Sequence, residues 1–360
     1  MNKKILIFPA GMPRSLEHLK KCVRDGREVI GSSSLAYDTA REQYPAWVHL
    51  PYVTDPEFDE ALRQAVTELG VGEIYTPNIV VWNYLNQNLG KMLPRVVLAN
   101  ASPVDEVLRG YRDAFAKARY LSGNQLPLSS DVSCRPLLSE IEIAGLSRYT
   151  EMIPGMCDDD KFHALLEIAR RAVRGDIVEI GNWWGKSAFI FSWLAHHFEI
   201  GKLLCVDPWT NEHLVQGEKI VDSGSEQVDA EEALRVFQIG LLPFNSNHIN
   251  YLRMTSVDGA AYYAGSRSVS TEAFGKTEYA GSISMLHIDG NHAYTAVKAD
   301  IESWQPFMSE GGWIVFDDYI WAFGDGPQRA GDEFLESNRP GIATAFVMGT
   351  ALFIQLSSRG

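Results

Sequence analysis

The stretch from Asp176 to Ser187 constrains the fold of this chain most strongly, because it reads as a buried strand, a glycine turn and the start of a helix. Its apolar run, Ile177 to Ile180, is typical of a strand buried on both faces of a parallel sheet. Gly181 and Gly185 follow, and glycines let the backbone approach a bound molecule closely. The helix that begins next offers amide donors that have no partner within the helix. The segment therefore predicts a ligand-binding turn at the end of a central strand.

A second buried strand follows at residues 202–207 and repeats this design. Its apolar residues end in the carboxylate of Asp207, and an acid there can accept hydrogen bonds from both hydroxyls of a ribose. The preceding turn lacks the glycine spacing of the dinucleotide fingerprint. The pair of strands favours a nucleoside-containing ligand, although a buried strand and a tight turn without any ligand would show the same glycines and acid.

Two more predicted strands end in carboxylates farther along the chain. Residues 283–289 finish at Asp289, and the run that starts at Gly311 ends in Asp317 and Asp318. The carboxyl ends of neighbouring parallel strands lie along one edge of a sheet, so these acids are expected to converge. Adjacent carboxylates repel one another unless a positive group lies among them, and hard oxygen ligands suit Mg²⁺. The acids predict a site for Mg²⁺ or another divalent cation; helix capping or pairing with Arg or Lys is the alternative.

His292 is expected at the mouth of the same edge, because it follows Asp289 closely in the sequence. The ordinary pKa of an imidazole is near 6.5, so a neutral His292 could take a proton from a substrate hydroxyl while a neighbouring metal stabilises the alkoxide. The alternative is an imidazole that caps the next helix or hydrogen-bonds a carboxylate. His287 lies inside the strand and is expected to pack in the core.

The glycine turn resembles the Glu-x-Gly-x-x-x-Gly-x-Ser loop of class I S-adenosylmethionine-dependent methyltransferases, and an acid follows the next strand as it does in that family. The resemblance implies that the loop contacts the amino-acid part of the cofactor and that the acid holds its ribose. It also implies a contact on the adenine side after the third strand, 249–254. The cofactor contacts expected on this basis are Glu179, Gly181, Asn182, Trp183, Gly185, Ser187, Asp207 and Ser256.

The later motifs are Asp289-Gly-Asn-His and Gly311-Gly-Trp-Ile-Val-Phe-Asp-Asp-Tyr. They resemble the metal-dependent O-methyltransferases that act on deoxysugars of macrolide antibiotics, and the relatives grouped with cephalosporin-modifying enzymes. The resemblance covers about Thr150 to Glu336 and differs at Asn291, where that family often has an acid. The roles it implies are magnesium ligation by Asp289, Asp317 and Asp318 and proton abstraction by His292.

The predicted fold class is α/β, with a Rossmann-like methyltransferase domain in residues 149–360. The alternating pattern of Ala343 to Leu356 predicts a terminal hairpin, which would add antiparallel strands to a mostly parallel sheet. The polar stretch from Asn211 to Glu232 is expected to form a lid or substrate loop.

A smaller α/β domain is predicted in residues 1–100, where short apolar strands alternate with amphipathic helices. Segments such as Glu28-Val-Ile-Gly and Ile74-Tyr-Thr-Pro resemble the domain that precedes the catalytic part of ATP-grasp ligases. Because no glycine-rich phosphate loop or basic cluster accompanies them, an accessory role is expected. Residues 101–148 are predicted to form a helical linker.

Composition narrows the choice of partners. The chain has 32 Lys and Arg against 46 Asp and Glu, a net charge of −14, so nucleic-acid phosphate would be repelled. Its four cysteines show no paired spacing and are expected to be reduced. The first apolar run is too short for a signal peptide and no stretch is long enough to span a membrane, so a cytoplasmic enzyme is expected.

The sequence as a whole predicts an O-methyltransferase that acts on a hydroxyl of a small molecule such as a sugar, glycoside or natural-product intermediate. One alternative is a sugar- or natural-product-modifying enzyme of the same fold without methyl transfer. Another is a non-catalytic binding module with a vestigial cofactor site. Neither a nucleic acid nor a membrane is expected as a partner, and assembly as a homo-oligomer is left open.

Overall fold

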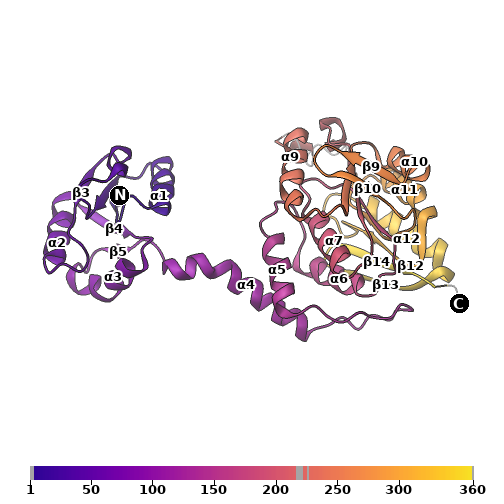
Figure 1. Ribbon diagram of the computed structural model, residues 1–360, viewed down its shortest axis with the longest axis horizontal. Coiled ribbons are helices and arrows are strands. Elements are labelled where there is room, and N and C mark those ends of the chain that lie inside the picture. The colour runs from indigo at the N-terminus through magenta and orange to yellow at the C-terminus, as the bar shows by residue number, and fades with distance from the viewer. Residues whose placement is uncertain (1–3, 216–221, 225–226, 359–360) are drawn as a thin grey trace. The chain divides into compact units, whose positions relative to one another are not determined.

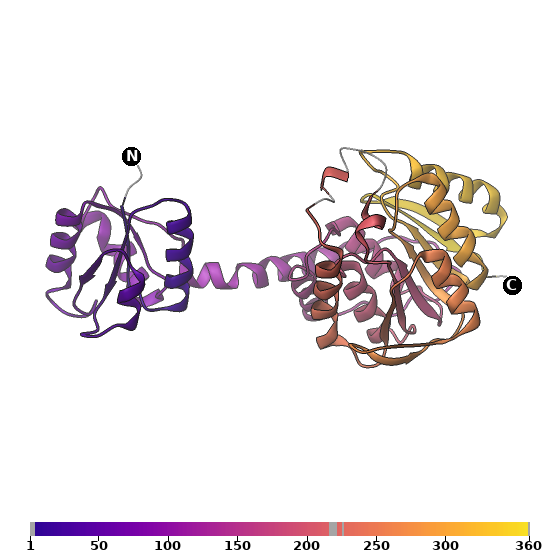
Figure 2. The ribbon, with the colours of Figure 1, turned by 90° about the horizontal axis from the view of Figure 1, so that it is seen from above.

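The computed structural model describes residues 4–215, 222–224 and 227–358. Two compact units divide the chain, Met1–Arg112 and Asp113–Gly360, and each is a sheet flanked by helices (Figures 1 and 2). The boundary falls within helix α4 (Pro103–Gly123), so the stretch 101–148 expected as a linker is shared between the two units. Of the expected lid, residues 216–221 and 225–226 lie outside the described ranges.

The N-terminal unit contains a five-stranded parallel sheet with the order β3-β2-β1-β4-β5. Its strands are β1 (Lys4–Ile7), β2 (Val29–Ser33), β3 (Trp47–His49), β4 (Val71–Tyr75) and β5 (Val97–Leu98). Helix α1 (Pro13–Arg24) packs on one face, and α2 (Phe58–Leu69) and α3 (Ile79–Met92) pack on the other. Ile5, Leu6 and Ile7 are all 0% exposed, as a central strand covered on both faces requires.

The C-terminal unit contains a seven-stranded sheet with the order β13-β14-β12-β11-β6-β7-β8. Its strands are β6 (Asp176–Ile180), β7 (Leu203–Val206), β8 (Ile249–Leu252), β11 (Ile283–Ile288), β12 (Met308–Phe316), β13 (Ile342–Met348) and β14 (Ala351–Leu356). Strands β8, β7, β6, β11 and β12 run parallel, whereas β14 is antiparallel to both of its neighbours. The predicted parallel sheet with a terminal antiparallel hairpin is therefore confirmed. Strands β9 (Ser268–Thr271) and β10 (Gly275–Glu278) pair separately.

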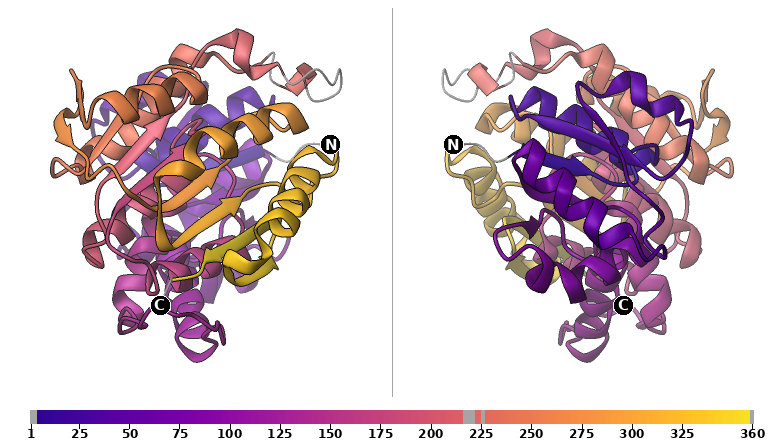
Figure 3. Two further views of the ribbon diagram at one scale, coloured as in Figure 1. Left: turned by 90° about the vertical axis from the view of Figure 1, so that its right-hand side faces the viewer. Right: turned by 90° about the vertical axis from the view of Figure 1, so that its left-hand side faces the viewer.

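Helices cover both faces of this sheet (Figure 3). One core takes in α5 (Glu140–Thr150), α6 (Asp159–Ala169), α7 (Lys186–His197) and α9 (Ala230–Leu241). The other takes in α10 (Ser256–Gly265), α11 (Tyr294–Trp304) and α12 (Gly326–Asn338). The short 3₁₀ helices are η1 (Thr39–Gln43), η2 (Asn211–Leu214), η3 (Leu242–Phe244), η4 (Gln305–Phe307) and η5 (Arg339–Gly341). Among the helices of the described residues, none combines the length and apolar composition that a membrane crossing requires.

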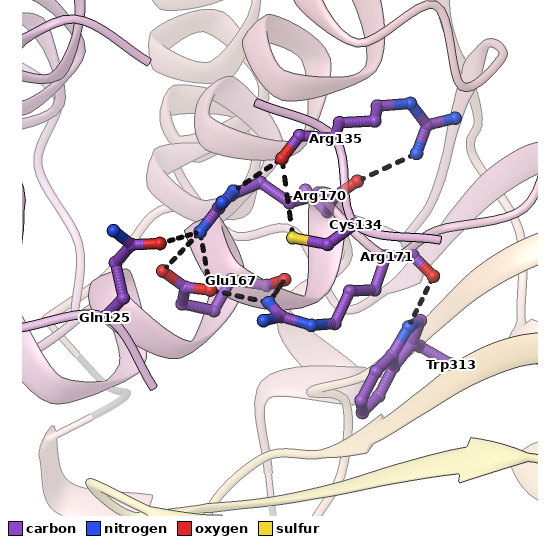
Figure 4. A network of polar contacts seen from close by, with 8 residues as sticks. Gln125, Cys134, Arg135, Glu167, Arg170, Arg171 and Trp313 are labelled. Atoms are coloured by element: carbon purple, nitrogen blue, oxygen red, sulfur yellow. Dashed lines mark hydrogen bonds and ion pairs between the residues drawn. The ribbon is translucent and has the colours of Figure 1, made fainter. Parts of the chain in front are cut away.

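A buried ionic network fastens the segment between α4 and α5 to helix α6 (Figure 4). Glu167 is 0% exposed and accepts hydrogen bonds from Arg170 Nη1 at 2.9 Å and Arg171 Nη1 at 2.6 Å. Arg170 also donates to Gln125 Oε1 and to the Arg135 carbonyl oxygen, each at 3.0 Å. The latter part of the expected linker is therefore packed onto the C-terminal unit.

Candidate active site

Four neighbouring parallel strands, β7, β6, β11 and β12, end at one edge of the C-terminal sheet. The amides of Gly181, Asp289 and Asp317 each donate to a carbonyl of the adjacent strand at 2.8–2.9 Å, so the residues after the strands stay in register. Asp207 continues the same row after β7. The predicted convergence of strand-end acids along this edge is present in the structure.

The glycine turn fits closely against its neighbours. Gly181 has φ of +78°, and a Cβ there would lie 2.0 Å from the carbonyl oxygen of Asp289. Gly185 has φ of +91°, and a Cβ there would lie 2.9 Å from the ring of Phe237. Both positions therefore require glycine. Helix α7 begins directly after this turn, with no side-chain cap and with Ser187 buried in its first turn.

Asp207 holds the turn in place through its carboxylate. Oδ2 accepts from the amides of Asn182 at 2.8 Å and Trp183 at 3.1 Å, and Oδ1 accepts from the Trp209 amide at 2.8 Å. Burial raises the pKa of Asp207, and these three amides partly oppose that rise. The acid was predicted to accept from both hydroxyls of a ribose. In the structure its carboxylate already accepts three hydrogen bonds, and Oδ1, which accepts only one of them, retains an acceptor position.

Glu179 and Ser256 are both engaged in hydrogen bonds to other side chains. Glu179 is 0% exposed; Oε2 accepts from Asn182 Nδ2 at 2.6 Å, and Oε1 lies 2.9 Å from His287 Nδ1. The Ser256 hydroxyl accepts from Trp304 Nε1 at 3.0 Å, which ties α10 to α11. Both residues were predicted to contact the cofactor directly. To do so, their side-chain oxygens would have to bind the cofactor as well as their present partners.

Two buried polar atoms of the turn have no hydrogen-bond partner within the described structure, Asn182 Oδ1 and Trp183 Nε1. Trp183 also has φ of +45°, which is uncommon for a bulky residue and costs free energy. Buried polar groups are almost always paired in folded proteins. One acceptor and one donor at the turn are thus ready for a polar ligand, and the residues fit the predicted cofactor in this respect.

The inner acids of the edge enclose a lysine that the sequence analysis did not assign to the site. Lys161 Nζ forms an ion pair with Asp317 Oδ2 and lies 3.8 Å from Asp289 Oδ2. His287, which is 0% exposed as predicted, also bridges Glu179 and Asp317, with Nε2 3.4 Å from Asp317 Oδ2. A buried histidine expected only to pack therefore links the turn to the acids.

A readable signal for Lys161 did exist in the sequence. Lys161, Leu165 and Ile168 share one face of α6, and all three are buried. A lysine on the apolar face of a helix is rarely buried unless it is paired. Its position on that face could have indicated that Lys161 pairs with buried acids, although the sequence does not show which acids these are.

The pKa values at the inner position follow from burial and these charges. Burial and the neighbouring Asp317 carboxylate raise the pKa of Asp289 well above its ordinary value. Burial would also raise the pKa of Asp317, but Lys161 and His287 outweigh it and hold that pKa well below the ordinary value. Burial would lower the pKa of Lys161, and the charges of Asp317 and Asp289 raise it instead. Asp317 and Lys161 therefore form a charged pair.

The outer part of the edge carries the second group of side chains. His292 Nε2 lies 3.0 Å from Asp318 Oδ2. Asp289, His292 and Asp318 each offer a ligand atom within 4.8 Å of the others, and His287, Asp289 and Asp317 do the same at the inner position. The His292 ring packs on Trp321 with centroids 4.5 Å apart. The structure thus brings together all four predicted residues of the acid and base site.

These residues fit a divalent cation by their chemistry. Three carboxylates contribute three formal negative charges, and Lys161 supplies one positive charge, which leaves a charge of −2 when all are ionised. Mg²⁺ in proteins is usually bound by a few carboxylate oxygens and keeps several water ligands. Because Asp317 is engaged by Lys161, the outer group of Asp289, His292 and Asp318 is the better placed set.

Comparison with known proteins finds similarity in the part of the chain that carries this site. Residues 178–319 match the family model of a methyltransferase domain. One curated relative, the uncharacterized protein y4gI of Sinorhizobium fredii, is 27% identical over 143 residues. That match covers 39% of this chain and only 13% of the relative, so the chain spans a small part of that protein.

Several solved structures are similar to this chain. The O-methyltransferase NovP is 14% identical, with a TM-score of 0.39 and coverage of 69% of this chain and 99% of NovP. The calicheamicin methyltransferase CalS11 is 13% identical, with a TM-score of 0.40 and coverage of 71% and 94%. MycE, a methyltransferase of the mycinamycin pathway solved with Mg, SAH and mycinamycin VI, is 16% identical, with a TM-score of 0.37 and coverage of 62% and 55%.

These distant likenesses carry no argument about the site. The family match does, because it spans the strands from β6 to β12 and so includes both the glycine turn and the strand-end acids. The seven-stranded sheet also has the parallel strands and the terminal hairpin that the sequence predicted. The C-terminal unit of this chain is therefore similar to methyltransferase domains over residues 178–319.

Proposed function

We propose that this protein transfers the methyl group of S-adenosylmethionine to a hydroxyl of a small molecule. The observation that carries the proposal is the pair of orphaned polar atoms, Asn182 Oδ1 and Trp183 Nε1, in a glycine turn whose amides are fixed by Asp207. The amides at the start of α7 and the remaining acceptor position of Asp207 complete a cradle for a polar, nucleoside-containing cofactor.

His292 is the proposed base. His292 Nε2 lies 3.0 Å from Asp318 Oδ2, so the Asp318 carboxylate stabilises the positive charge that a neutral imidazole gains when it accepts a proton. The acceptor oxygen forms a bond to the methyl carbon as the carbon–sulfur bond breaks, and the hydroxyl proton goes to His292. Because the leaving thioether is neutral, the alignment of the two substrates matters more than acid catalysis.

Asp289 and Asp318, with His292 beside them, would hold a divalent cation such as Mg²⁺. Such an ion would supply positive charge that stabilises the developing alkoxide. Asp317, predicted as a third ligand, forms an ion pair with Lys161 in the structure.

An aromatic surface beside the base supports a ring-bearing acceptor. Trp321 packs on His292, and Phe323 packs edge-on against Trp321 with centroids 5.5 Å apart. Phe323 is 54% exposed and the neighbouring Ile320 is 57% exposed. Such a surface can pack against the ring of a sugar, a glycoside or a natural-product intermediate.

Calorimetric titration of S-adenosylmethionine and of its demethylated product into the full chain, with and without Mg²⁺, tests the proposal. We expect micromolar binding to the wild type. We expect Asp207→Ala to lose it, because the turn is no longer held. Asp105→Ala, which removes only an exposed ion pair with Arg112, is the matched control. No binding to the wild type under any condition would refute the methyltransferase activity.

A further inference from the structure

Lys161 lies at a place where a carboxylate metal site would not ordinarily tolerate a cation. Its side chain is 3% exposed and sits in the first turn of α6. That turn is fixed, because the Lys161 amide donates to the capping carboxylate of Asp158 at 2.7 Å and Phe162 beside it is 1% exposed. The ammonium group is therefore held among the acids by the helix rather than reaching them from solvent.

The contacts divide the three acids into two classes. Asp317 is 7% exposed, and its carboxylate is held by Lys161, by His287 and by the amide of Asp318. Asp289 and Asp318 have side chains that are 25% exposed, and both belong to the outer group with His292. One acid is thus neutralised inside the fold, while the two others remain partly exposed.

We propose that Lys161 is a built-in cation that takes Asp317 out of the metal set and confines a divalent ion to Asp289 and Asp318. This inference rests on the proposed function, because it concerns the cation of that site. An ion held there meets two available carboxylates instead of three and is repelled by the ammonium group. The chain therefore binds divalent cations more weakly than its three acids suggest, and Lys161 is a positioning residue that sets this affinity.

Titration of the full chain with Mn²⁺, followed by the electron paramagnetic resonance signal of the free ion, tests the inference without any acceptor. We expect Lys161→Met to tighten Mn²⁺ binding, because it removes the repelling charge, by about tenfold to hundredfold, the size of change that substitutions beside metal ligands produce. Lys161→Arg keeps the charge and should leave the affinity close to that of the wild type. Unchanged or weaker binding in a folded Lys161→Met variant would overturn the inference.

The wild-type background gives a second test in case Lys161→Met does not fold. Asp318→Asn should abolish Mn²⁺ binding, whereas Asp317→Asn should reduce it far less, because Asp317 is not a ligand. Equal losses in the two variants would contradict the inference. Titration of S-adenosylmethionine into the same proteins separates the two proposals: absent cofactor binding refutes methyl transfer, while the ranking of Mn²⁺ affinities judges Lys161 alone.

Discussion

The two sheets of this chain share a parallel architecture and differ at the edge where their strands end. In the N-terminal sheet, two residues there bond to each other: the Thr76 amide donates to Asn100 Oδ1 at 3.1 Å, and Asn100 Nδ2 donates to the Thr76 carbonyl oxygen at 2.9 Å. In the C-terminal sheet, the same edge carries Asp289, Asp317 and Asp318 beside a turn with orphaned polar atoms.

The two sheets therefore show that the fold supplies a position and that the side chains at this position supply the chemistry. Charges gathered at a partly buried edge are costly unless they are paired. An edge that retains acids and unpaired atoms is therefore poised for a ligand, whereas an edge that closes on itself contributes to stability alone. Substitutions in the two units test this contrast.

The largest effect is expected at the acidic edge. His292→Ala should lower the turnover number about 10²–10⁴-fold, because it removes the group that takes the hydroxyl proton. His49→Ala is the matched control, since that exposed imidazole lies in β3 of the N-terminal sheet. Methyl transfer at saturating S-adenosylmethionine, to an acceptor that the wild type methylates, measures both. Full turnover in His292→Ala would show that another group is the base.

The next largest effect is expected on stability, where a buried ion-pair network in the C-terminal unit is compared with a partly exposed ion pair in the N-terminal unit. Glu167→Ala leaves Arg170 and Arg171 without their buried counterion and should destabilise the C-terminal unit by about 3–5 kcal/mol. The matched change in the N-terminal unit is Glu73→Ala, which removes a partner of Arg27 that is 25% exposed and should cost about 1 kcal/mol or less. Hydrogen exchange in denaturant reads each unit separately, and equal losses would contradict this expectation.

Asp300 should make the stability of the C-terminal unit depend on pH. Burial raises its pKa from 3.8 to about 7, and a hydrogen bond with Ser256 only partly opposes this. As pH rises from the lower value to the higher, the unfolded chain releases the proton while the folded chain keeps it, so stability falls. The full loss is roughly 4 kcal/mol and is constant above the higher pKa. Unfolding measured across this range should show that Asp300→Asn removes this slope, and an unchanged slope would show that other groups cause it.

Much of this site could be predicted because it follows from short sequence segments. A glycine turn and the acids that end strands are local features, and the geometry of a parallel sheet brings them to one edge whatever the rest of the chain does. The convergence of Asp207, Asp289 and Asp317 along that edge needed no further information. The terminal hairpin followed from strict alternation in the same way.

The polar partners of those groups could not be predicted, because they depend on how distant elements pack. Lys161 reaches Asp317 from a helix far earlier in the chain. The carboxylate of Asp207 turned out to bind backbone amides, which carry no sequence signal. His287 was correctly expected to be buried, but its bond to Glu179 depends on the register of β11 and β6.

Two glycines with similar backbones offer a smaller and more controlled contrast. Gly181 has φ of +78° and no room for a Cβ, whereas Gly70, which ends α2, has φ of +69° and open space. Gly70→Ala should cost only the left-handed conformation, about 1–2 kcal/mol. Gly181→Ala should add about 1–3 kcal/mol of overpacking and weaken S-adenosylmethionine binding. Calorimetric unfolding and cofactor titration measure both, and equal costs would show that the turn can shift.

The smallest effect on activity is expected at the N-terminal edge, and it tests whether that edge is only structural. Asn100→Ala removes both bonds to Thr76, which is 0% exposed, and leaves its amide unsatisfied at a cost of about 1–3 kcal/mol. Asn88→Ala removes a single bond to the Tyr84 carbonyl oxygen in α3 and is the matched control. Cofactor affinity and methyl transfer should be unchanged in both variants, because the acids and the glycine turn belong to the other sheet. A fall in either quantity for Asn100→Ala alone would mean that the closed edge takes part in the reaction, and the contrast between the two sheets would no longer separate stability from function.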